Sequence, residues 1–433
     1  SLRVLMAIAA NQQWHIHQLD VDTAFLYAPV DEEIYMDQPE GFVKEAPSGR
    51  KLVCRLKKSL YGTKQAPRNW NGTLHAWLSD FGFERSLADP GIYVYYKNGN
   101  HYLLAVYVDD MIITGKDISW IRSFKDAIQV QFQIKDLGQV KWVLGIGVEI
   151  GKKQISINQS KYIDDMLSRF NLTDCKIALT PKTTGKFDEN DENWLDNQQS
   201  ALYRSIIGSL LYAAVCSRPD ISYAVGNLSR YMAHPQMQHL TAAKRVLRYL
   251  KGSRCCGPSF SATSKTVSLT GYCDADWAGD SERRLSTSGY LFTLNGSPVS
   301  WKSKLQSTVA LSTAEAEYVA LCAAAKEAIF LRTLLYEIKI PHNQPTEIKE
   351  DNQSCIALKR IPICNERTKH IDIRYHFTLE KVLNIEILVR YCPTENMIAD
   401  ILTKPLPAPR HEKLTSMIFK DESSNALSGG VDI

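Results

Sequence analysis

The sequence lacks long apolar runs and paired cysteines, and it has only a small excess of positive charge. No apolar run reaches about 18 residues, the length that a membrane-spanning helix needs, so no transmembrane helix is indicated. None of the ten cysteines forms a CxxC pair or a Cys/His metal spacing, and Cys255 and Cys256 are adjacent, which disfavours a bridge between them. With no signal peptide visible, we expect reduced cysteines in an intracellular protein that does not contact membranes.

The formal net charge is only +4, so a surface that binds a polyanion would have to be local. Two stretches carry enough lysine and arginine for this, residues 44–68 and residues 242–254. The length of 433 residues predicts two to four domains, because a single core rarely grows so large. Hydrophobic residues make up 44% and charged residues 23%, which is typical of soluble globular protein.

Patterns in the first third of the chain predict a sheet with helices. Residues 14–21 alternate and read as a strand ending near Asp20, and residues 91–115 contain two β-rich runs joined by the Asn-Gly turn of "KNGN". Residues 119–132 have the spacing of an amphipathic helix. Residues 141–157 predict a further hairpin that turns near Gly151.

The rest of the chain predicts a helical segment followed by a second α/β block. Residues 180–199 form a polar connector, and residues 202–251 are helical in pattern. After another polar stretch, the order is three strands, helix, strand, helix, strand, helix, which implies a mixed sheet with helices on its faces. We expect little order after Pro405.

Adjacent carboxylates stand in "YVDDM", where Asp109 and Asp110 follow an apolar strand. An Asp-Asp pair is also a common turn dipeptide, so a metal site requires partners elsewhere in the chain. Asp20 ends its own strand, and the three acids would meet at one sheet edge if the strands are neighbours. Their mutual repulsion would raise their pKa values until protons or divalent cations bound.

Four motifs resemble, in order and spacing, the reverse transcriptase of copia-type (pseudoviral) LTR retrotransposons. They are "QLDVDTAFLYAPVDEEIYMDQPEGF", "KSLYGTKQAPRNW", "YVDDM" and "KDLGQVKWVLGIGVEI". The resemblance implies that Asp20, Asp109 and Asp110 bind Mg²⁺, with the carbonyl of Val21 also available. It implies that Phe25 blocks a ribose 2′-OH, that Tyr61, Gly62 and Lys64 cradle the nucleotide and template, and that Leu144 and Gly145 hold the primer. Phe25 could equally be a core residue, Lys64 a solvated charge, and Leu144-Gly145 simple packing.

A second set of acids lies in separate elements of the later block. Asp274, Glu317, Asp351 and Asp400 resemble the Asp-Glu-Asp-Asp set of ribonuclease H, amid the copia-like wording "LSTAEAEYVAL", "RTKHIDIRYHF" and "MIADILTKPL". Glu315 is the alternative to Glu317, and the two point about 200° apart on a helix. Glu317 fits better because Ala320 and Ala324 follow it on the same face.

Several other residues have both a functional and a structural interpretation. Asp276 could join the second site or be a solvated strand-end acid, and His370 and His376 could contact substrate or be structural. Lys244, Arg245, Arg248 and Lys251 crowd one to two helical turns and would track the phosphates of an RNA/DNA hybrid, unless they form a solvated helix face.

The resemblance implies a fold of the α+β and α/β classes. It implies a reverse transcriptase palm with partial fingers and the primer-grip hairpin (1–157), thumb and connection helices with a polar linker near 180–199 (158–262), a ribonuclease H-like mixed-sheet domain (263–405) and a tail (406–433). The first residues, "SLRVLMAIAA", lack Met and read as an internal helix, so we expect a chain truncated at its fingers. Departures from the family pattern are Asp22, where Lys is common, and Asn365, where His is often seen.

The implied function is RNA-directed DNA synthesis and cleavage of RNA in a hybrid, with two Mg²⁺ ions (or Mn²⁺) at each site. The implied partners are RNA template, DNA primer, RNA/DNA hybrid, dNTPs and other parts of the polyprotein. The implied location is a cytoplasmic virus-like particle with a possible nuclear stage. Because the fingers are missing, two alternatives stay open: a hybrid-specific ribonuclease alone, or an inactive relic that binds nucleic acid.

Overall fold

The computed structural model describes residues 1–188, 190–262, 266–280, 282–357 and 369–420. The chain divides into two compact units, which are described separately. The N-terminal unit comprises Ser1–Leu5, Gln12–Val140 and Glu337–Lys339. The C-terminal unit comprises Met6–Asn11, Lys141–Tyr336 and the chain from Ile340 onward, and helix α1 (Leu2–Gln12) contributes to both units.

A six-stranded antiparallel sheet in the order β4-β5-β6-β7-β1-β8 lies at the centre of the N-terminal unit. The predicted Asn-Gly turn is confirmed, because Asn98 and Gly99 both have positive φ and join adjacent strands. The strands are β1 (His15–Val21), β4 (Glu84–Arg85), β5 (Ile92–Lys97), β6 (Asn100–Tyr107), β7 (Asp110–Gly115) and β8 (Ile134–Gln139).

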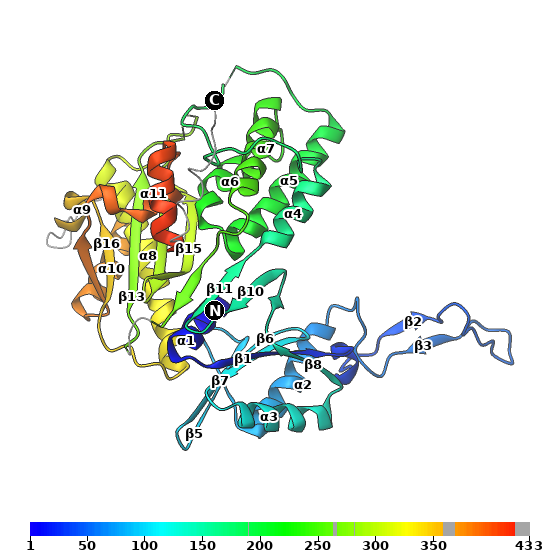
Figure 1. The fold of residues 1–433 in the computed structure, drawn as a ribbon. Helices are drawn as coiled ribbons and strands as arrows, with labels where there is room; N and C mark the ends of the chain where they lie inside the picture. The colour runs from blue at the N-terminus through cyan, green and yellow to red at the C-terminus, as the bar shows by residue number, and fades with distance from the viewer. Residues whose placement is uncertain (189, 263–265, 281, 358–368, 421–433) are drawn as a thin grey trace. The chain divides into compact units, whose positions relative to one another are not determined.

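Two amphipathic helices, α2 (Ala66–Phe81) and α3 (Ile118–Gln131), pack on this sheet (Figure 1). Helix α2 buries Trp70, Leu74 and Leu78, which recur every fourth residue on one face. Helix α3 begins after Asp117, whose carboxylate accepts a hydrogen bond from the backbone N–H of Ser119 at 2.8 Å. The predicted amphipathic helix is therefore confirmed to within a residue at each end.

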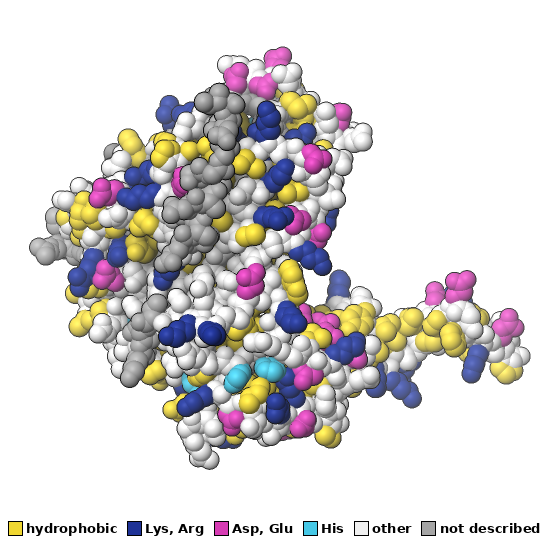
Figure 2. Space-filling view, viewed as in Figure 1, with side chains coloured by type: hydrophobic (Ala, Val, Ile, Leu, Met, Phe, Trp, Pro, Cys, Tyr) yellow, Lys and Arg dark blue, Asp and Glu magenta, His cyan; other side chains and the backbone are white. Residues whose placement is uncertain are grey.

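A hairpin of β2 (Tyr35–Asp37) and β3 (Val53–Arg55) extends from the sheet of this unit, after the short helix η1 (Ala24–Tyr27) (Figure 1). Apolar side chains along it are exposed, as Figure 2 shows; they are Tyr35, Phe42, Val43, Leu52 and Val53. Two cations of the basic stretch are paired with acids: Lys51 with Asp37 at 2.9 Å and Arg55 with Glu33 at 2.8 Å. These pairs reduce the positive charge available on the hairpin.

The C-terminal unit begins with a four-stranded antiparallel sheet in the order β12-β11-β10-β9, followed by a helical bundle. The strands are β9 (Trp142–Val143), β10 (Ile146–Ile150), β11 (Gln154–Asn158) and β12 (Ser259–Ser261). The helices are α4 (Ser160–Arg169), α5 (Asn197–Cys216), η2 (Pro219–Ile221), α6 (Ser222–Ser229) and α7 (Met237–Gly252).

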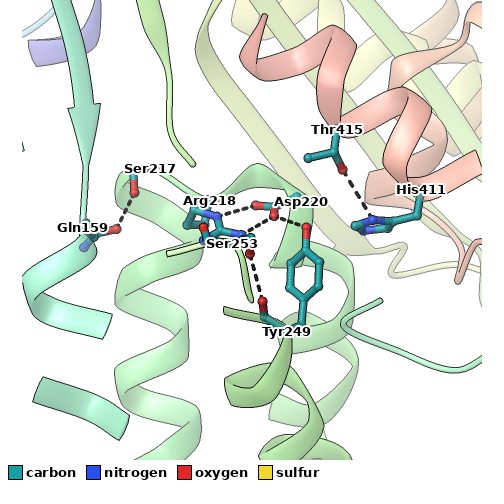
Figure 3. Close-up of polar contacts among 8 residues, drawn as sticks. All are labelled: Gln159, Ser217, Arg218, Asp220, Tyr249, Ser253, His411 and Thr415. Atoms are coloured by element: carbon teal, nitrogen blue, oxygen red, sulfur yellow. Dashed lines mark hydrogen bonds and ion pairs between the residues drawn. The ribbon is translucent and has the colours of Figure 1, made fainter. Parts of the chain in front are cut away.

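A buried ion pair ties the helices of this bundle together (Figure 3). The guanidinium of Arg218 donates to both carboxylate oxygens of Asp220, at 2.9 and 2.6 Å, and both side chains are fully buried. The hydroxyl of Tyr249 donates to Asp220 at 2.7 Å, and Arg218 also donates to the carbonyl of Ser253 at 2.8 Å. Since a buried charge is tolerated only when it is paired and hydrogen-bonded, this network defines how η2 packs on α7.

A five-stranded mixed sheet in the order β15-β14-β13-β16-β17 forms the second part of the C-terminal unit. Strands β13, β14 and β15 form an antiparallel meander, whereas β16 pairs in parallel with β13 and β17. The predicted order of three strands, helix, strand, helix, strand is confirmed. The elements are β13 (Leu269–Asp276), β14 (Thr287–Leu294), β15 (Ser297–Leu305), α8 (Thr313–Glu337), β16 (Thr346–Glu350), α9 (Gln353–Ala357), α10 (Lys369–Leu383), β17 (Ile387–Tyr391), η5 (Thr394–Asn396), η6 (Ile398–Leu402) and α11 (Ala408–Phe419).

Two expectations about boundaries differ from the structure. The division between the units falls at residues 140/141, so the hairpin of β10 and β11, predicted with residues 1–157, belongs to the C-terminal unit. The expectation of little order after Pro405 is wrong for α11, because Leu414, Ile418 and Phe419 join an apolar cluster with Leu291 and Trp301. None of the described helices is long and apolar enough to span a bilayer.

Candidate functional site

Strand pairing brings the first carboxylate set together in the N-terminal unit. Strands β1 and β7 are antiparallel neighbours, and Asp20 stands directly opposite Asp110 in their register. The backbone N–H of Val21 donates to the carbonyl of Asp109 at 3.0 Å. The three predicted acids, Asp20, Asp109 and Asp110, therefore come from adjacent strands at one edge of the sheet, as the sequence predicts.

The charges of these acids act on one another. Burial, and then repulsion from Asp109 and Asp110, raises the pKa of Asp20 above its ordinary value. The amide of Gln18 donates to Asp110 at 3.1 Å. Asp22, which the sequence leaves open as a fourth charge, pairs with Lys135 at 2.5 Å. Its charge is therefore largely balanced by a lysine of the neighbouring strand.

The turn that carries the two adjacent aspartates has an unfavourable backbone conformation. Val108, which precedes them, has φ of 58°, in the left-handed region that β-branched residues rarely occupy. The indole N–H of buried Trp70 donates to the carbonyl of Val108 at 2.7 Å. Helix α2 thus holds the turn in this conformation and positions the two residues that follow it, Asp109 and Asp110.

Two of the predicted nucleotide-binding residues, Val21 and Tyr61, lie near these acids. The rings of Phe25 and Tyr61 are 4.5 Å apart, and Asp109 contributes, after burial, to raising the pKa of Tyr61. Phe25 and Val21 are buried, whereas Gly62 and Lys64 are exposed. Gly62 has a φ of +97°, a backbone conformation that favours glycine. An added Cβ would meet no atom within 4 Å, so lack of space is not the reason for glycine here.

The predicted primer-holding residues, Leu144 and Gly145, lie in the C-terminal unit between β9 and β10. Both have positive φ, 48° and 70°. The hydroxyl of Tyr212 on α5 donates to the carbonyl of Leu144 and also lies next to Gly145. The turn is therefore held by the helical bundle.

The second carboxylate set converges in the C-terminal unit. Asp274 comes from β13, Glu317 from α8 and Asp400 from η6, and Asp351 directly follows β16. Among the described residues, ligand oxygens lie within 4.8 Å of one another in two triplets that share Asp351. One triplet is Asp274, Asp351 and Asp400; the other is Glu317, Glu350 and Asp351. All four predicted acids are thus brought together, whereas the palm acids are in neither triplet.

The structure separates the two glutamates that the sequence leaves as alternatives. Glu317 is 6% exposed and faces the other acids. Glu315 is partly exposed and accepts a hydrogen bond from the backbone N–H of Leu311 at 2.8 Å, at the start of α8. The geometry therefore places Glu317 in the cluster and gives Glu315 a structural contact at the helix terminus.

Basic and hydroxyl residues that sequence reasoning missed hold the two deepest aspartates. Lys404 lies 2.8 Å from Asp400 and 3.4 Å from Asp274. Arg410 pairs with Asp400, and the hydroxyl of Thr403 donates to Asp274. The one sequence signal is the spacing of Lys404, four residues after Asp400 in "DILTK", which places both on one face if the segment is helical.

Glu350 is a further carboxyl that the sequence analysis missed. It is fully buried at the end of β16, beside Asp351. It accepts hydrogen bonds from the thiol of Cys273 at 3.1 Å and from the backbone N–H of Asn352 at 3.0 Å. The alternation in "TEIKED" could have identified it, because Thr346, Ile348 and Glu350 all point into the core.

The electrostatics of this cluster favour a bound cation. Burial, followed by repulsion from neighbouring acids, raises the pKa of Glu317. Burial raises the pKa of Glu350, while its hydrogen bonds from Cys273 and Asn352 partly oppose this. Burial also raises the pKa of Asp274, although Lys404 partly opposes this. One oxygen of Glu317 has no hydrogen-bond partner among the described residues. An all-oxygen set of this kind fits a hard divalent cation such as Mg²⁺ or Mn²⁺.

The remaining predicted residues have less direct relations to the cluster. Asp276 lies on β13, two residues after Asp274, and burial raises its pKa. His376 is exposed on α10, while the side chain of His370 and all of Asn365 lie outside the described residues.

Three of the four predicted phosphate-tracking cations contact the chain itself. Arg245 donates to Thr180, Arg248 to the carbonyl of Lys176 and Lys251 to the carbonyl of Cys175. These cations therefore fasten the segment before the polar connector to α7, and they remain partly exposed together with Lys244.

Comparisons with known proteins identify relatives of this chain. A family model described as reverse transcriptase (RNA-dependent DNA polymerase) matches residues 1–184. The chain is 39% identical over 426 residues to the retrovirus-related Pol polyprotein from transposon TNT 1-94 of Nicotiana tabacum, covering 96% of this chain and 32% of that protein. It is 35% identical over 305 residues to a transposon Ty5-1 protein of Saccharomyces cerevisiae, covering 70% of this chain and 97% of that protein.

The chain thus spans about a third of the length of the tobacco relative. Among solved structures, the N-terminal RNase H domain of a Mycobacterium tuberculosis protein matches with 12% identity, covering 35% of this chain and 98% of that chain. The TM-score of this match is 0.25.

Proposed function

Because the chain belongs to the family of copia-type transposon Pol polyproteins, in its reverse transcriptase and ribonuclease H region, we propose that it acts on nucleic acid at two sites. The C-terminal unit cuts the RNA strand of an RNA/DNA hybrid. The N-terminal unit extends a DNA primer on an RNA template. Both reactions are phosphoryl transfers that use two divalent metal ions, Mg²⁺ or Mn²⁺, at each site.

The observation that carries the hydrolytic activity is the pair of carboxylate triplets joined through Asp351. Two triplets that share one ligand can hold two cations a few ångströms apart, which suits in-line displacement at a phosphodiester. Bound metal would supply a hydroxide at neutral pH and stabilise the leaving oxygen. Asp274 and Asp400 would hold one ion and Glu317 the other, with Asp351 between them.

The residues around the acids would position the substrate and the ions. Thr403 and Arg410 hold Asp274 and Asp400 in fixed orientations, and Thr394 donates to Asp351 at 2.8 Å. Lys404 places a positive charge beside Asp274 and Asp400, where the negative charge of a phosphodiester would otherwise be repelled.

The polymerase proposal rests on the register that sets Asp20 opposite Asp110, with Asp109 at the same edge. These acids would bind the ions that activate the primer 3′-OH and hold the triphosphate of a dNTP. Tyr61 and the buried ring of Phe25 would form the floor under the nucleotide, and Phe25 would exclude a ribose 2′-OH. Leu144 and Gly145 would hold the primer terminus.

The natural setting that we propose is a virus-like particle in the cytoplasm, with a nuclear stage before integration. Other parts of the polyprotein would be partners there. Lys244, Arg245, Arg248 and Lys251 would add sequence-independent phosphate contacts weakened by salt, using the donors that their own backbone contacts leave available.

An assay with purified protein and Mg²⁺ tests both activities separately. We expect extension of oligo(dT) on poly(rA) that is lost in Asp110→Asn but kept in Asp274→Asn. We expect RNA cleavage in a hybrid with the opposite pattern. Cleavage without extension would restrict the function to hybrid hydrolysis, and absence of both from a folded protein would leave a nucleic-acid-binding relic.

A further inference from the structure

A cavity of about 600 Å³ lies in the C-terminal unit beside the hydrolytic carboxylates. Lys404 lines this cavity and also forms ion pairs with Asp274 and Asp400. Asp276, two residues after Asp274 on β13, lines it as well. A group bound in the cavity would therefore lie next to the substrate bond that the carboxylate cluster cuts.

One wall of the cavity presents a buried hydrogen-bond donor. His239 is 2% exposed, and its Nδ1 accepts a hydrogen bond from the backbone N–H of Gln236 at 3.0 Å. Burial lowers the pKa of His239 to about 4, so the ring is neutral at pH 7 and its proton is on Nε2. Nε2 has no hydrogen-bond partner in the described part of the chain. Since a buried donor without an acceptor is unfavourable, this wall favours an acceptor in the cavity.

A half-buried cation lies on the same side of the cavity. The ammonium of Lys182 is 4.2 Å from the centre of the Phe187 ring, and that ring meets His239 edge to face at 4.7 Å. Among the described residues no carboxylate forms an ion pair with Lys182. Burial, followed by repulsion from Arg230, lowers the pKa of Lys182 to about 8, so it remains mostly charged at neutral pH. An anion would stabilise this cation.

The lining also contains acids. Asp276 is half-buried with the charges of Lys404 and Arg230 nearby, and the other acids are paired or exposed. Arg230 forms an ion pair with Asp280 at 3.3 Å, which balances that carboxylate. Asp188 and Glu282 are exposed to solvent, where their charges are screened.

Two buried polar atoms of the lining lack a hydrogen-bond partner among the described residues: the donor Nε2 of His239 and the amide oxygen of Asn227. The donor of His239 and the nearby cation of Lys182 are complemented by an anion with acceptor oxygens.

We propose that this cavity, the phosphate pocket, binds a backbone phosphate of the nucleic-acid strand that lies in the hydrolytic site, with His239 and Lys182 as donors. The proposal rests on the proposed function only in taking that strand to be part of an RNA/DNA hybrid. Contacts to the backbone set the register of a strand without reading its sequence. The pocket would thus fix how far along the hybrid the cut falls.

Protection of Lys182 tests the pocket in the unaltered chain. The protein is treated with an amine-reactive acylating reagent in EDTA, where metal-dependent cleavage does not interfere, and labelled lysines are measured by mass spectrometry. We expect a short RNA/DNA hybrid to slow labelling of Lys182 several-fold and to leave exposed Lys152, in the β10–β11 turn, unchanged. Labelling of Lys182 that the hybrid does not slow would overturn the proposal. So would equal protection by inorganic phosphate at the same phosphate concentration, since the pocket would then take a free anion and not a strand.

A pair of matched variants gives a second measurement. Lys182→Met should weaken hybrid binding about tenfold, as expected for loss of one charged contact, and reduce the salt slope of log K by about 1. Lys152→Met removes the same charge from the turn and should leave both quantities unchanged. Equal effects of the two variants would show a general charge effect and reject the pocket. Because binding is measured without turnover, this outcome is independent of whether the chain cleaves RNA.

Discussion

The two glutamates at the start of α8 are two residues apart and have different surroundings. Glu317 is buried with Glu350 and Asp351, and one of its oxygens has no partner in the described chain. Glu315 accepts a hydrogen bond from the backbone N–H of Leu311. A helix turns about 100° per residue, so neighbours at this spacing cannot share a face. The acid of the carboxylate cluster and the acid that contacts the helix terminus are therefore separated within one turn.

This separation predicts different effects of two substitutions. Glu317→Gln should lower hybrid cleavage by at least about 100-fold, because it replaces a proposed carboxylate metal ligand with an amide of the same shape. Glu315→Ala should cost about 1 kcal/mol of unfolding free energy through loss of the helix-terminal contact, with cleavage retained. Cleavage rates and urea unfolding of both variants provide the measurement. A cleavage defect in Glu315→Ala as large as that in Glu317→Gln would contradict the assignment.

At the scale of elements, α11 illustrates what sequence patterns miss. Its apolar residues Leu414, Ile418 and Phe419 are few and follow three prolines, so the segment resembles a tail. In the structure these side chains pack with Trp301 of β15. His411 of the same helix meets Tyr249 edge to face at 5.3 Å, near the buried ion pair (Figure 3). These tertiary contacts come from distant parts of the chain, so the local pattern of α11 does not reveal them.

The packing of α11 gives a second prediction. Leu414→Ala should lower the unfolding free energy of the C-terminal unit by about 2–5 kcal/mol, because Leu414 is completely buried. Lys413→Ala, at the exposed neighbouring position, should change it by less than about 0.5 kcal/mol. Urea unfolding of the two variants is the test. Similar midpoints for both would mean that α11 does not dock on this unit in solution.

At the scale of the whole molecule, the sequence motifs predict elements better than they predict contacts. Periodicity and turn residues identify the strands that carry Asp20 and Asp110. The Asn-Gly turn identifies the hairpin of β5 and β6, and β6 pairs with the strand of Asp110. Local patterns do not specify which side chain lies opposite a buried acid, because that depends on elements far away in the chain. The contacts of Lys404 and Arg410 with Asp400 and the burial of Glu350 follow from that packing, and sequence reasoning therefore missed them.

The buried acids also make the stability of the chain depend on pH and on metal. Burial raises the pKa of Asp274 to about 7 and that of Glu350 to about 8. In the unfolded chain both acids are ionised well below pH 7. A group with a raised pKa in the folded state stabilises the fold at low pH, and this contribution is lost as the pH rises through the folded-state value. The buried histidines His239 and His411 have lowered pKa values, so they change the unfolding free energy mainly below about pH 6.5.

In EDTA, Asp274 and Glu350 should therefore together lower the unfolding free energy of the C-terminal unit between pH 7 and 8.5 by roughly 1–2 kcal/mol. Saturating Mg²⁺ should remove most of this fall, because a bound cation stabilises the ionised carboxylates that burial otherwise opposes. Urea midpoints at several pH values, with and without Mg²⁺, measure the effect of the ion. Titrating groups remote from the ion contribute equally to both series, so their contributions cancel in the difference. Asp274→Asn should show a smaller Mg²⁺ effect than the parent chain. Identical pH slopes with and without Mg²⁺ would mean that these acids do not bind the ion, and the hydrolytic site would have to be sought elsewhere.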